Sequence, residues 1–193
     1  VLAKIDDLLN RKLAESPYAD KLDVDEYNVL LRDTRMDLAL FREENIPLGT
    51  ELTKLGQRYN EICGAMMVEF DGEERTMQQM GKYLQVNERG IRESAYTTVG
   101  ERRFQDSEEI DDLYDKMIAL RHQIAQNAGY ENYRDYIFDA KHRFDYSPAD
   151  CEAFQDAVGA ICVPLMRDVD EVRRQTLNLE SLRMWDLGQD VHG

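Results

Sequence analysis

The chain is a succession of long stretches in which apolar residues recur every three to four positions, separated by short breaks. The first stretch carries Leu2, Ile5, Leu8, Leu9 and Leu13 on one side. That period is typical of amphipathic α-helices. The 193 residues include 11 glycines and 4 prolines, together about 8% of the chain against an average near 12%. The pattern therefore predicts a mostly α fold, a multi-helix array of long amphipathic helices.

Prolines and glycines mark most of the breaks between these helices. Pro17 ends the first helix, and two more are expected over residues 25–44 and 47–64. A long helix is expected over residues 106–128, where Gly129 supplies a C-terminal stop. The sequence contains neither an internal repeat nor a Ser/Gly-rich linker, which favours one continuous helical body.

Further helix starts are indicated by residues that cap backbone N–H groups. Three pairs have the spacing of a capping box: Thr76 with Gln79, Asp106 with Glu109, and Ser147 with Asp150. Asn87 is a simpler cap, and Pro148 occupies the favoured first helical position. Pro164 lies inside the last helical pattern, where it removes a backbone hydrogen bond and should kink the helix.

Residues 65–75 break the helical period and predict a β-hairpin. Apolar side chains alternate at Met66, Val68 and Phe70, and Asp71-Gly72 then supplies a two-residue turn. A lone hairpin is marginally stable in water, so one of its faces should lie on helices. The alternative is that the hairpin offers an edge to an extended peptide.

The charge of the chain excludes several classes of partner. With 24 basic and 39 acidic side chains the formal charge is −15, and the pI is about 4.6. Such a surface repels phosphate backbones, so we expect no nucleic acid partner. No apolar run reaches the roughly 20 residues of a membrane span, and the first residues lack the pattern of a signal peptide, so we expect no membrane partner. Carboxylate runs such as Glu73-Glu74 and Asp111-Asp112 are expected to be solvated.

Cys63, Cys151 and Cys162 are odd in number and widely spaced. Such spacing is neither a disulfide framework nor a zinc knuckle, and it fits a reducing cytoplasm. Cys151 and Cys162 would be separated by roughly 16 Å along a helix, too far for a bond. We expect all three to pack in the core.

No motif identifies a catalytic, cofactor-binding or metal site, and we predict no such residues in this chain. His122, His142 and His192 lie 20 and 50 residues apart, without an i, i+4 pair. The sequence contains no H-E-x-x-H, no C-x-x-C and no acidic calcium loop. It also lacks a G-x-S-x-G nucleophile motif and a glycine loop for phosphate. His122, at the polar margin of its helix, is interpreted as a surface or capping residue, with catalysis as the alternative.

Two features leave an alternative open. Arg121 falls on the apolar side of helix 106–128, where its charge needs a carboxylate partner or a route to water. A structural ion pair is the first interpretation, and a clamp for a substrate carboxylate is the second. An aromatic cluster is best interpreted as a junction between helices, and otherwise as a substrate lining. Its members are Tyr130, Tyr133, Tyr136, Phe138, Phe144 and Tyr146.

Several stretches, in this order, resemble the thimet oligopeptidase and oligoendopeptidase F family of zinc metallopeptidases. The first is GAMMVEFDGEERTMQQMGKYL, residues 64–84. The second is NERGIRESAYTTVGERR, residues 87–103, with its Arg-x-x-Arg-Glu-x-Ala pattern. The third is LRHQIAQNAGYENYRDY, residues 120–136, which continues through FDYSPADCEAF to LRMWDL, residues 182–187.

The resemblance implies a cytoplasmic peptidase that cleaves short peptides in a channel between two mostly helical halves. In that family, two histidines of an H-E-x-x-H helix and a distant Glu bind zinc, and the Glu of the motif acts as general base. Residues 1–105 would be the N-terminal helical region with the hairpin, and residues 106–193 the opening helices of the catalytic region. Both would form part of the channel wall.

Because the family pattern places its zinc ligands downstream of these residues, the chain is expected to be an N-terminal fragment of such a peptidase. By itself it should neither bind the catalytic zinc nor hydrolyse peptides, and the missing catalytic region would be its partner. The alternative is a stand-alone acidic helical scaffold or interaction protein without catalytic activity. Against that alternative, a channel wall without its opposite half would expose apolar surface.

Overall fold

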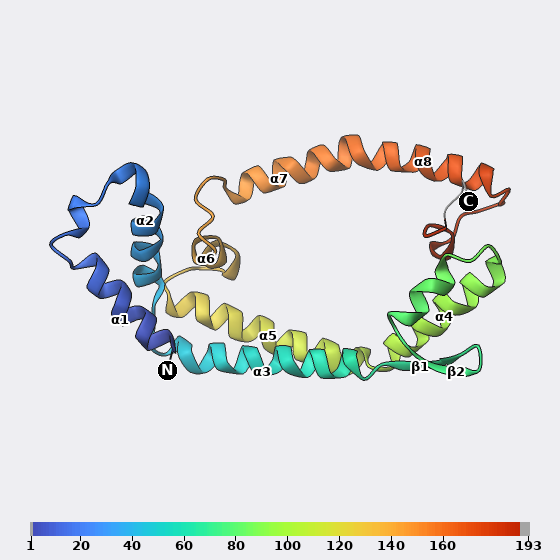
Figure 1. The fold of residues 1–193 in the computed structure, drawn as a ribbon, viewed down its shortest axis with the longest axis horizontal. Helices are drawn as coiled ribbons and strands as arrows, with labels where there is room; N and C mark the ends of the chain where they lie inside the picture. The colour runs from blue at the N-terminus through green and yellow to red at the C-terminus, as the bar shows by residue number, and fades with distance from the viewer. Residues whose placement is uncertain (1, 190–193) are drawn as a thin grey trace. The chain divides into compact units, whose positions relative to one another are not determined.

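Long helices make up most of the chain in the computed structural model, which describes residues 2–189 (Figure 1). The predicted mostly α fold with a β-hairpin is confirmed. The contacts divide the chain into two interleaved units, the first built from residues 1–57 and 113–151 and the second from residues 58–112 and 152–193. These boundaries differ from the family-based division at residue 105, which stays a prediction.

The first unit begins with two helices packed on each other, α1 (Leu2–Ala14) and α2 (Val24–Leu40), joined through the short 3-10 helix η1 (Ala19–Lys21). Asp23 caps α2, because its Oδ1 accepts from the backbone N–H groups of Asp25 at 2.9 Å and Glu26 at 3.2 Å. The helix ends earlier than the expected residue 44, since Phe41 is extended with ψ 127°.

The apolar side of α1 is exposed. Leu2, Ile5, Leu8 and Leu9 keep 75%, 45%, 57% and 57% of their surface accessible. An amphipathic helix normally turns this side towards a core. The stripe predicted from the sequence is therefore present, but within the described chain it is not covered.

The first unit is completed by α6 (Tyr133–Ala140) and by parts of two longer helices, residues 45–57 of α3 (Asn45–Gly64) and residues 113–127 of α5 (Ser107–Asn127). The predicted stop at Gly129 is confirmed: its φ is +90°, and Tyr130 N–H bonds Ala125 C=O at 2.9 Å, as in a Schellman motif. Two side chains bind carbonyls near this helix end. Arg42 Nε donates to Asn127 C=O at 3.0 Å, and Asn45 Nδ2 donates to Ile124 C=O at 3.1 Å.

The second unit contains the predicted hairpin, with β1 (Met67–Phe70) antiparallel to β2 (Glu73–Thr76). Asp71 and Gly72 turn the chain with φ of +57° and +74°, the signs of a type I′ turn. Val68 is buried with Met80 of η2 (Gln79–Leu84) and Ala95 of α4 (Arg89–Gln105). The expectation that one face of the hairpin lies on helices is confirmed.

Two of the predicted capping boxes form. Thr76 N–H bonds Gln79 Oε1 at 2.8 Å, and Gln79 N–H returns to Thr76 Oγ1 at 3.2 Å, although the segment that follows is a short 3-10 helix. Ser147 N–H bonds Asp150 Oδ2 at 2.8 Å, and Asp150 N–H bonds Ser147 Oγ at 3.3 Å. Pro148 opens α7 (Pro148–Ala157), as predicted.

The other two predicted caps are wrong. The Asp106 carboxylate accepts from Arg102 and the Glu109 carboxylate pairs with Arg58, so the two residues do not close a box. Glu88, not Asn87, precedes α4. The Asn87 side chain accepts from Gln189 Nε2 at 3.2 Å instead. In each case another partner takes the side chain that a cap would need: Arg102 one turn away for Asp106, and the distant Arg58 and Gln189 for Glu109 and Asn87.

Next to Pro164 the structure contains a π turn, and the kink predicted for this helix stays a prediction. Between α7 and α8 (Val163–Thr176) the backbone widens into a π turn, Val158–Cys162, and the Val163 N–H bonds Val158 C=O five residues back. Pro164 itself lies in the first turn of α8, where a missing donor is tolerated. The irregular backbone hydrogen bonding of this helix therefore lies in the π turn, just before the proline.

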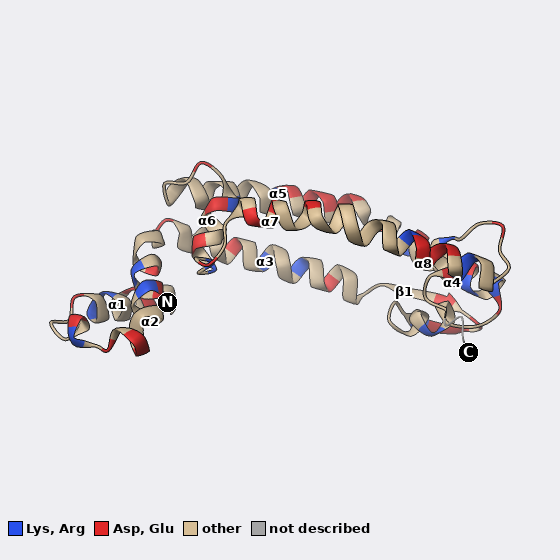
Figure 2. Ribbon diagram, turned by 90° about the horizontal axis from the view of Figure 1, so that it is seen from above, with Lys and Arg blue, Asp and Glu red and all other residues tan. Residues whose placement is uncertain are grey.

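The prediction that all three cysteines pack in the core is wrong. Cys162 is exposed and Cys63 and Cys151 are half-buried, so none is a core residue, because the helices that carry them lack cover on those sides. All three thiols are free. The carboxylate runs at residues 73–74 and 111–112 are exposed as expected, and Figure 2 shows acidic residues along α5. Among the described residues, no helix is long and apolar enough to cross a membrane.

Candidate functional site

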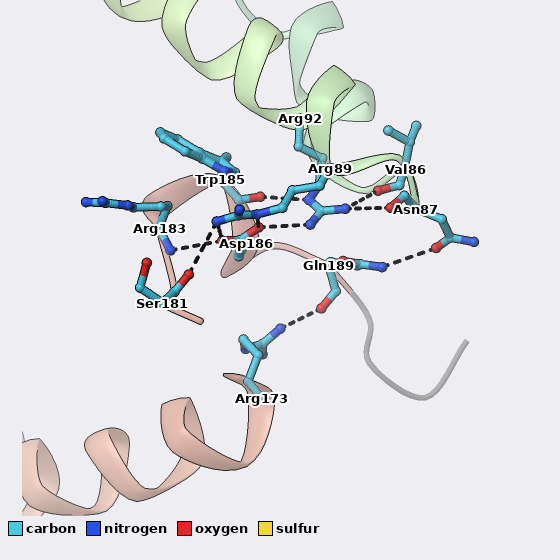
Figure 3. Close-up of polar contacts among 10 residues, drawn as sticks. All are labelled: Val86, Asn87, Arg89, Arg92, Arg173, Ser181, Arg183, Trp185, Asp186 and Gln189. Carbon is cyan, nitrogen blue, oxygen red and sulfur yellow. Dashed lines mark hydrogen bonds and ion pairs between the residues drawn. The ribbon is translucent and has the colours of Figure 1, made fainter. Parts of the chain in front are cut away.

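Two arginines at the start of α4 meet an aspartate of the 3-10 helix η4 (Met184–Asp186) (Figure 3). Arg89 and Arg92 are three residues apart and therefore share one side of the helix. Arg92 Nη2 donates to Asp186 Oδ1 at 2.9 Å, and Arg89 donates to Oδ1 from Nε at 3.1 Å and to Oδ2 from Nη2 at 3.0 Å. We call Arg89, Arg92 and Asp186 the Arg–Asp cluster.

The remaining donors of Arg92 are bound to backbone carbonyls. Nε donates to Trp185 C=O at 3.0 Å, and Nη1 donates to Val86 and Asn87 C=O, each at 2.9 Å. The Arg92 side chain is 2% exposed and that of Asp186 is 0% exposed. Burial of both charges is tolerated because each is paired and hydrogen-bonded.

Asp186 has no acceptor position left for a ligand. Besides the two guanidinium groups, the Arg183 backbone N–H donates to Asp186 Oδ2 at 2.9 Å. Four donated hydrogen bonds match the roughly four lone-pair directions of a carboxylate. Burial alone would raise the pKa of Asp186, but the hydrogen bonds from Arg89, Arg92 and Arg183 lower it to about 2. This carboxylate therefore stays ionised and acts as an anchor, not as a base or a metal ligand.

Aromatic stacking strengthens the same attachment. The rings of Tyr96 and Trp185 lie with centroids 5.7 Å apart, and the Arg89 guanidinium lies 6.0 Å from the Trp185 ring. Arg173 Nη1 donates to Gln189 C=O at 2.6 Å on the other side of the segment (Figure 3). The result is a chain segment, residues 181–189, held to the N-terminal end of α4 and to α8.

Both halves of the cluster are visible in the sequence, but their contact is not. The Arg-x-x-Arg pattern and the stretch LRMWDL were separate pieces of one resemblance. The available signal was an aspartate inside a mainly apolar stretch and a pair of arginines on one helix side, each needing a counter-charge. Pattern alone cannot pair residues 97 positions apart.

The first unit contains an open pocket of about 710 Å³ between α1, α2, α3 and α6. Tyr136 of the aromatic cluster lines it together with Asp37, Arg42 and Asn45. Arg42 is engaged with backbone carbonyls and Asn45 with Asn127 as well as Ile124 C=O, so both are occupied in holding α5. The pocket therefore has a lining of both polar and apolar side chains, and the polar ones named here are not free to bind a ligand together.

The aromatic cluster joins helices, as its first interpretation predicts. The Tyr136 ring packs on Tyr130 and Tyr133 at 5.7 and 5.8 Å, and the Arg32 guanidinium of α2 lies 4.4 Å from the Phe144 ring. Burial and the hydrogen bond it donates to Asp139 raise the pKa of Tyr130 to about 12. The substrate-lining interpretation stays a prediction, since Tyr136 also borders the pocket.

Arg121 does not form the structural ion pair expected of it. Its guanidinium lies 5.9 Å from the centroid of the Tyr133 ring, and among the described residues no carboxylate forms an ion pair with it. A half-buried arginine can be stabilised by an aromatic face while its tip reaches water. The second interpretation, a clamp for a substrate carboxylate, stays a prediction.

The histidines do not converge. His142 lies between two carboxylates of α2, with Nε2 2.8 Å from Asp37 Oδ1 and Nδ1 3.5 Å from Asp33 Oδ2. His122 is exposed, as expected of a surface residue, and His192 lies outside the described residues. Across residues 2–189, no group of three or more His, Cys, Asp or Glu side chains is placed to hold a metal ion.

Comparison of the sequence with protein families gives one assignment. The model of peptidase family M3 matches residues 82–190, more than half of the chain, and the match contains all three residues of the Arg–Asp cluster. The chain therefore belongs to peptidase family M3. The suspected relationship to oligoendopeptidase F is confirmed at the level of the family. No curated protein sequence matches the chain.

Solved structures agree with this fold. A protein assigned as an oligoendopeptidase F from Bacillus anthracis str. Ames superimposes with a TM-score of 0.90 at 22% identity, over 97% of this chain and 35% of the other. A second structure assigned as an oligoendopeptidase F superimposes with a TM-score of 0.91 at 24% identity, over 97% of this chain and 34% of the other. The structure of PZ peptidase A with an inhibitor superimposes with a TM-score of 0.89 at 24% identity, over 96% of this chain and 34% of the other. The chain thus spans about one third of the length of these structures.

Proposed function

We propose that this chain is the N-terminal portion of a zinc-dependent oligopeptidase, a metalloendopeptidase that acts on short peptides. The observation that carries the proposal is the family M3 match over residues 82–190. The chain would form part of the wall of the substrate channel. Its Arg–Asp cluster would act as a positioning element, which holds residues 181–189 in place next to α4.

The residues described here do not fit the catalytic zinc. His142 is already engaged with Asp33 and Asp37, the Asp186 carboxylate is saturated, and no three ligands converge within residues 2–189. When bound in the whole enzyme, zinc would activate a water molecule for attack on the peptide carbonyl. Its ligands would come from an H-E-x-x-H helix and a distant Glu outside these residues.

A longer protein that contains this chain tests the proposal directly. We expect it to hydrolyse a fluorogenic peptide, to lose that activity when a chelator removes all zinc, and to regain it on addition of zinc. Activity that survives complete zinc removal contradicts the proposal. The 193-residue chain is the matched control, and we expect it to show neither hydrolysis nor stoichiometric zinc by metal analysis. One tightly bound zinc per chain would contradict that second expectation.

We propose the cytoplasm as the location of this peptidase. Three free thiols in one chain support a reducing compartment. The charge of −15 is compatible with a soluble peptidase surface and disfavours nucleic acid as a partner. The alternative, a stand-alone acidic scaffold, is disfavoured by the uncovered apolar residues of α1 and α8, because such surface on an independent protein promotes association.

A further inference from the structure

One side of α8, together with the end of the π turn before it, is apolar and uncovered. Its members recur at spacings of three and four residues and so lie on one side of the helix. They are Ile161, Leu165, Met166, Val169 and Val172, and between 52% and 62% of each is exposed. We call these five residues the α8 apolar face.

The contacts of the same helix with the chain segment that follows it come from arginines in its last turn. Arg173 donates to Gln189 C=O at 2.6 Å, and Arg174 Nη1 donates to Leu179 C=O at 2.7 Å. Both arginines are half-buried, whereas Leu165 and Val169 are exposed. A helix at the surface of a finished domain shows the reverse arrangement, with its apolar side inward. The α8 apolar face is therefore arranged to be covered by another part of a protein.

We propose that the α8 apolar face is the docking surface for the part of the family M3 chain that lies outside these 193 residues. The inference rests on the proposed function, since it takes the whole protein to be an M3 peptidase. The solved relatives are about three times as long as this chain, so most of such a protein remains to supply the cover. The family match runs through α8 to residue 190, which places the face inside the family region.

A second copy of the chain is a poorer occupant than the remainder of the same protein. Each copy carries a charge of −15, and two such surfaces repel each other at ordinary ionic strength. A covalently continuous partner is not limited by that repulsion, because its effective concentration is high. We therefore assign the α8 apolar face to the remainder of the same polypeptide.

Cys162 offers a natural reporter of this contact. It is exposed and lies four residues before Met166, on the same side of the helix. We expect iodoacetamide to alkylate Cys162 about tenfold more slowly in the whole protein than in the 193-residue chain, because a covered thiol reacts slowly. Site-resolved mass spectrometry measures the rate, with half-buried Cys63 and Cys151 as internal references.

Two matched double variants complete the test. Leu165→Gln with Val169→Gln should leave the Tm of the 193-residue chain unchanged but lower that of the whole protein by about 5 °C. Asp156→Gln with Arg167→Gln, at exposed positions on the opposite side, keeps the net charge and should change neither Tm. Equal effects of the two pairs in the whole protein would overturn the inference.

The remaining outcomes separate the two proposals. Equal alkylation of Cys162 in both proteins overturns the docking surface, even if the whole protein is an active peptidase. Protection of Cys162 in a protein without zinc-dependent activity supports the docking surface and overturns the proposed function. Protection that appears in the 193-residue chain and rises with its concentration assigns the face to a second copy and also overturns the inference.

Discussion

At the scale of single residues, Asp186 shows how a buried charge specifies an arrangement. Its carboxylate accepts from Arg89, Arg92 and the backbone of Arg183, and all of these donors are satisfied in the observed geometry of the segment. Replacing a buried ion pair with apolar residues can be neutral, but removing one partner leaves an uncompensated charge. The main contribution of the cluster is therefore to hold residues 181–189 in position, and its contribution to the net free energy of unfolding is smaller.

Asp186→Asn removes the negative charge and leaves two guanidinium groups facing a neutral amide. We expect the free energy of unfolding at pH 7 to fall by about 3 to 5 kcal/mol, as for other broken buried pairs. Urea unfolding followed by circular dichroism measures the change. Glu180→Gln, at an exposed carboxylate directly before the segment, is the control and should cost less than about 0.5 kcal/mol.

The same pair of proteins has a defined dependence on pH. The pKa of Asp186 in the folded state is about 2, below the value near 3.9 of an unfolded chain. The stabilisation by ionised Asp186 is thus fully present above about pH 4 and is lost as the pH falls towards 2. The difference between wild type and Asp186→Asn should shrink over that interval. A difference that stays constant from pH 7 to pH 2.5 would contradict the assignment.

At the scale of elements, the ends of the helices follow local chemistry wherever no tertiary partner competes. Ser147 with Asp150 and the stop at Gly129 were predictable, because each uses backbone groups within a few residues. The box of Asp106 and Glu109 was not, because Arg58 and Arg102 take its carboxylates. The Arg102–Asp106 pair is local, one helical turn apart, but the pair between Glu109 and the distant Arg58 is not visible in a sequence pattern.

Two glycine substitutions should act in opposite directions. Gly129→Ala places a side chain at φ +90°, and we expect it to destabilise the chain by about 1 kcal/mol. Gly56→Ala, inside α3 with no atom within 4 Å of the added Cβ, should stabilise it by about 0.5 to 1 kcal/mol. Thermal unfolding of both variants measures the changes. A Gly129→Ala variant as stable as the wild type or more stable would show that the C-terminal stop of α5 does not depend on the positive φ.

At the scale of the whole molecule, the helical class and the hairpin could be predicted from periodicity, and the interleaved units could not. Both units combine segments distant in sequence. Hydrophobic periodicity shows which side of a helix is apolar, but it does not specify which apolar sides pack on each other. The apolar stripe of α1 was correctly found in the sequence but remains largely exposed in the described chain. The absence of a candidate catalytic residue stays a prediction.

The exposed apolar surface should make the 193-residue chain bind a hydrophobic dye under native conditions. On α1, Leu8→Gln with Leu9→Gln should reduce the dye fluorescence, because both leucines are 57% exposed. Asp6→Asn with Lys12→Gln keeps the net charge and should leave the signal unchanged. Near-UV circular dichroism must stay native-like, since loosely packed states also bind such dyes. Equal loss with both pairs would place the dye elsewhere.

The π turn at Val158–Cys162 also bears on how relatives of this chain should be aligned. A π turn accommodates one more residue than an α turn while the helix on either side keeps its own bonding. A homologue with an unbroken α-helix here would carry a single-residue deletion between Phe154 and Leu165. An alignment that forbids that gap would shift every position of α8 by one, and would assign charged residues of one protein to the apolar face of the other.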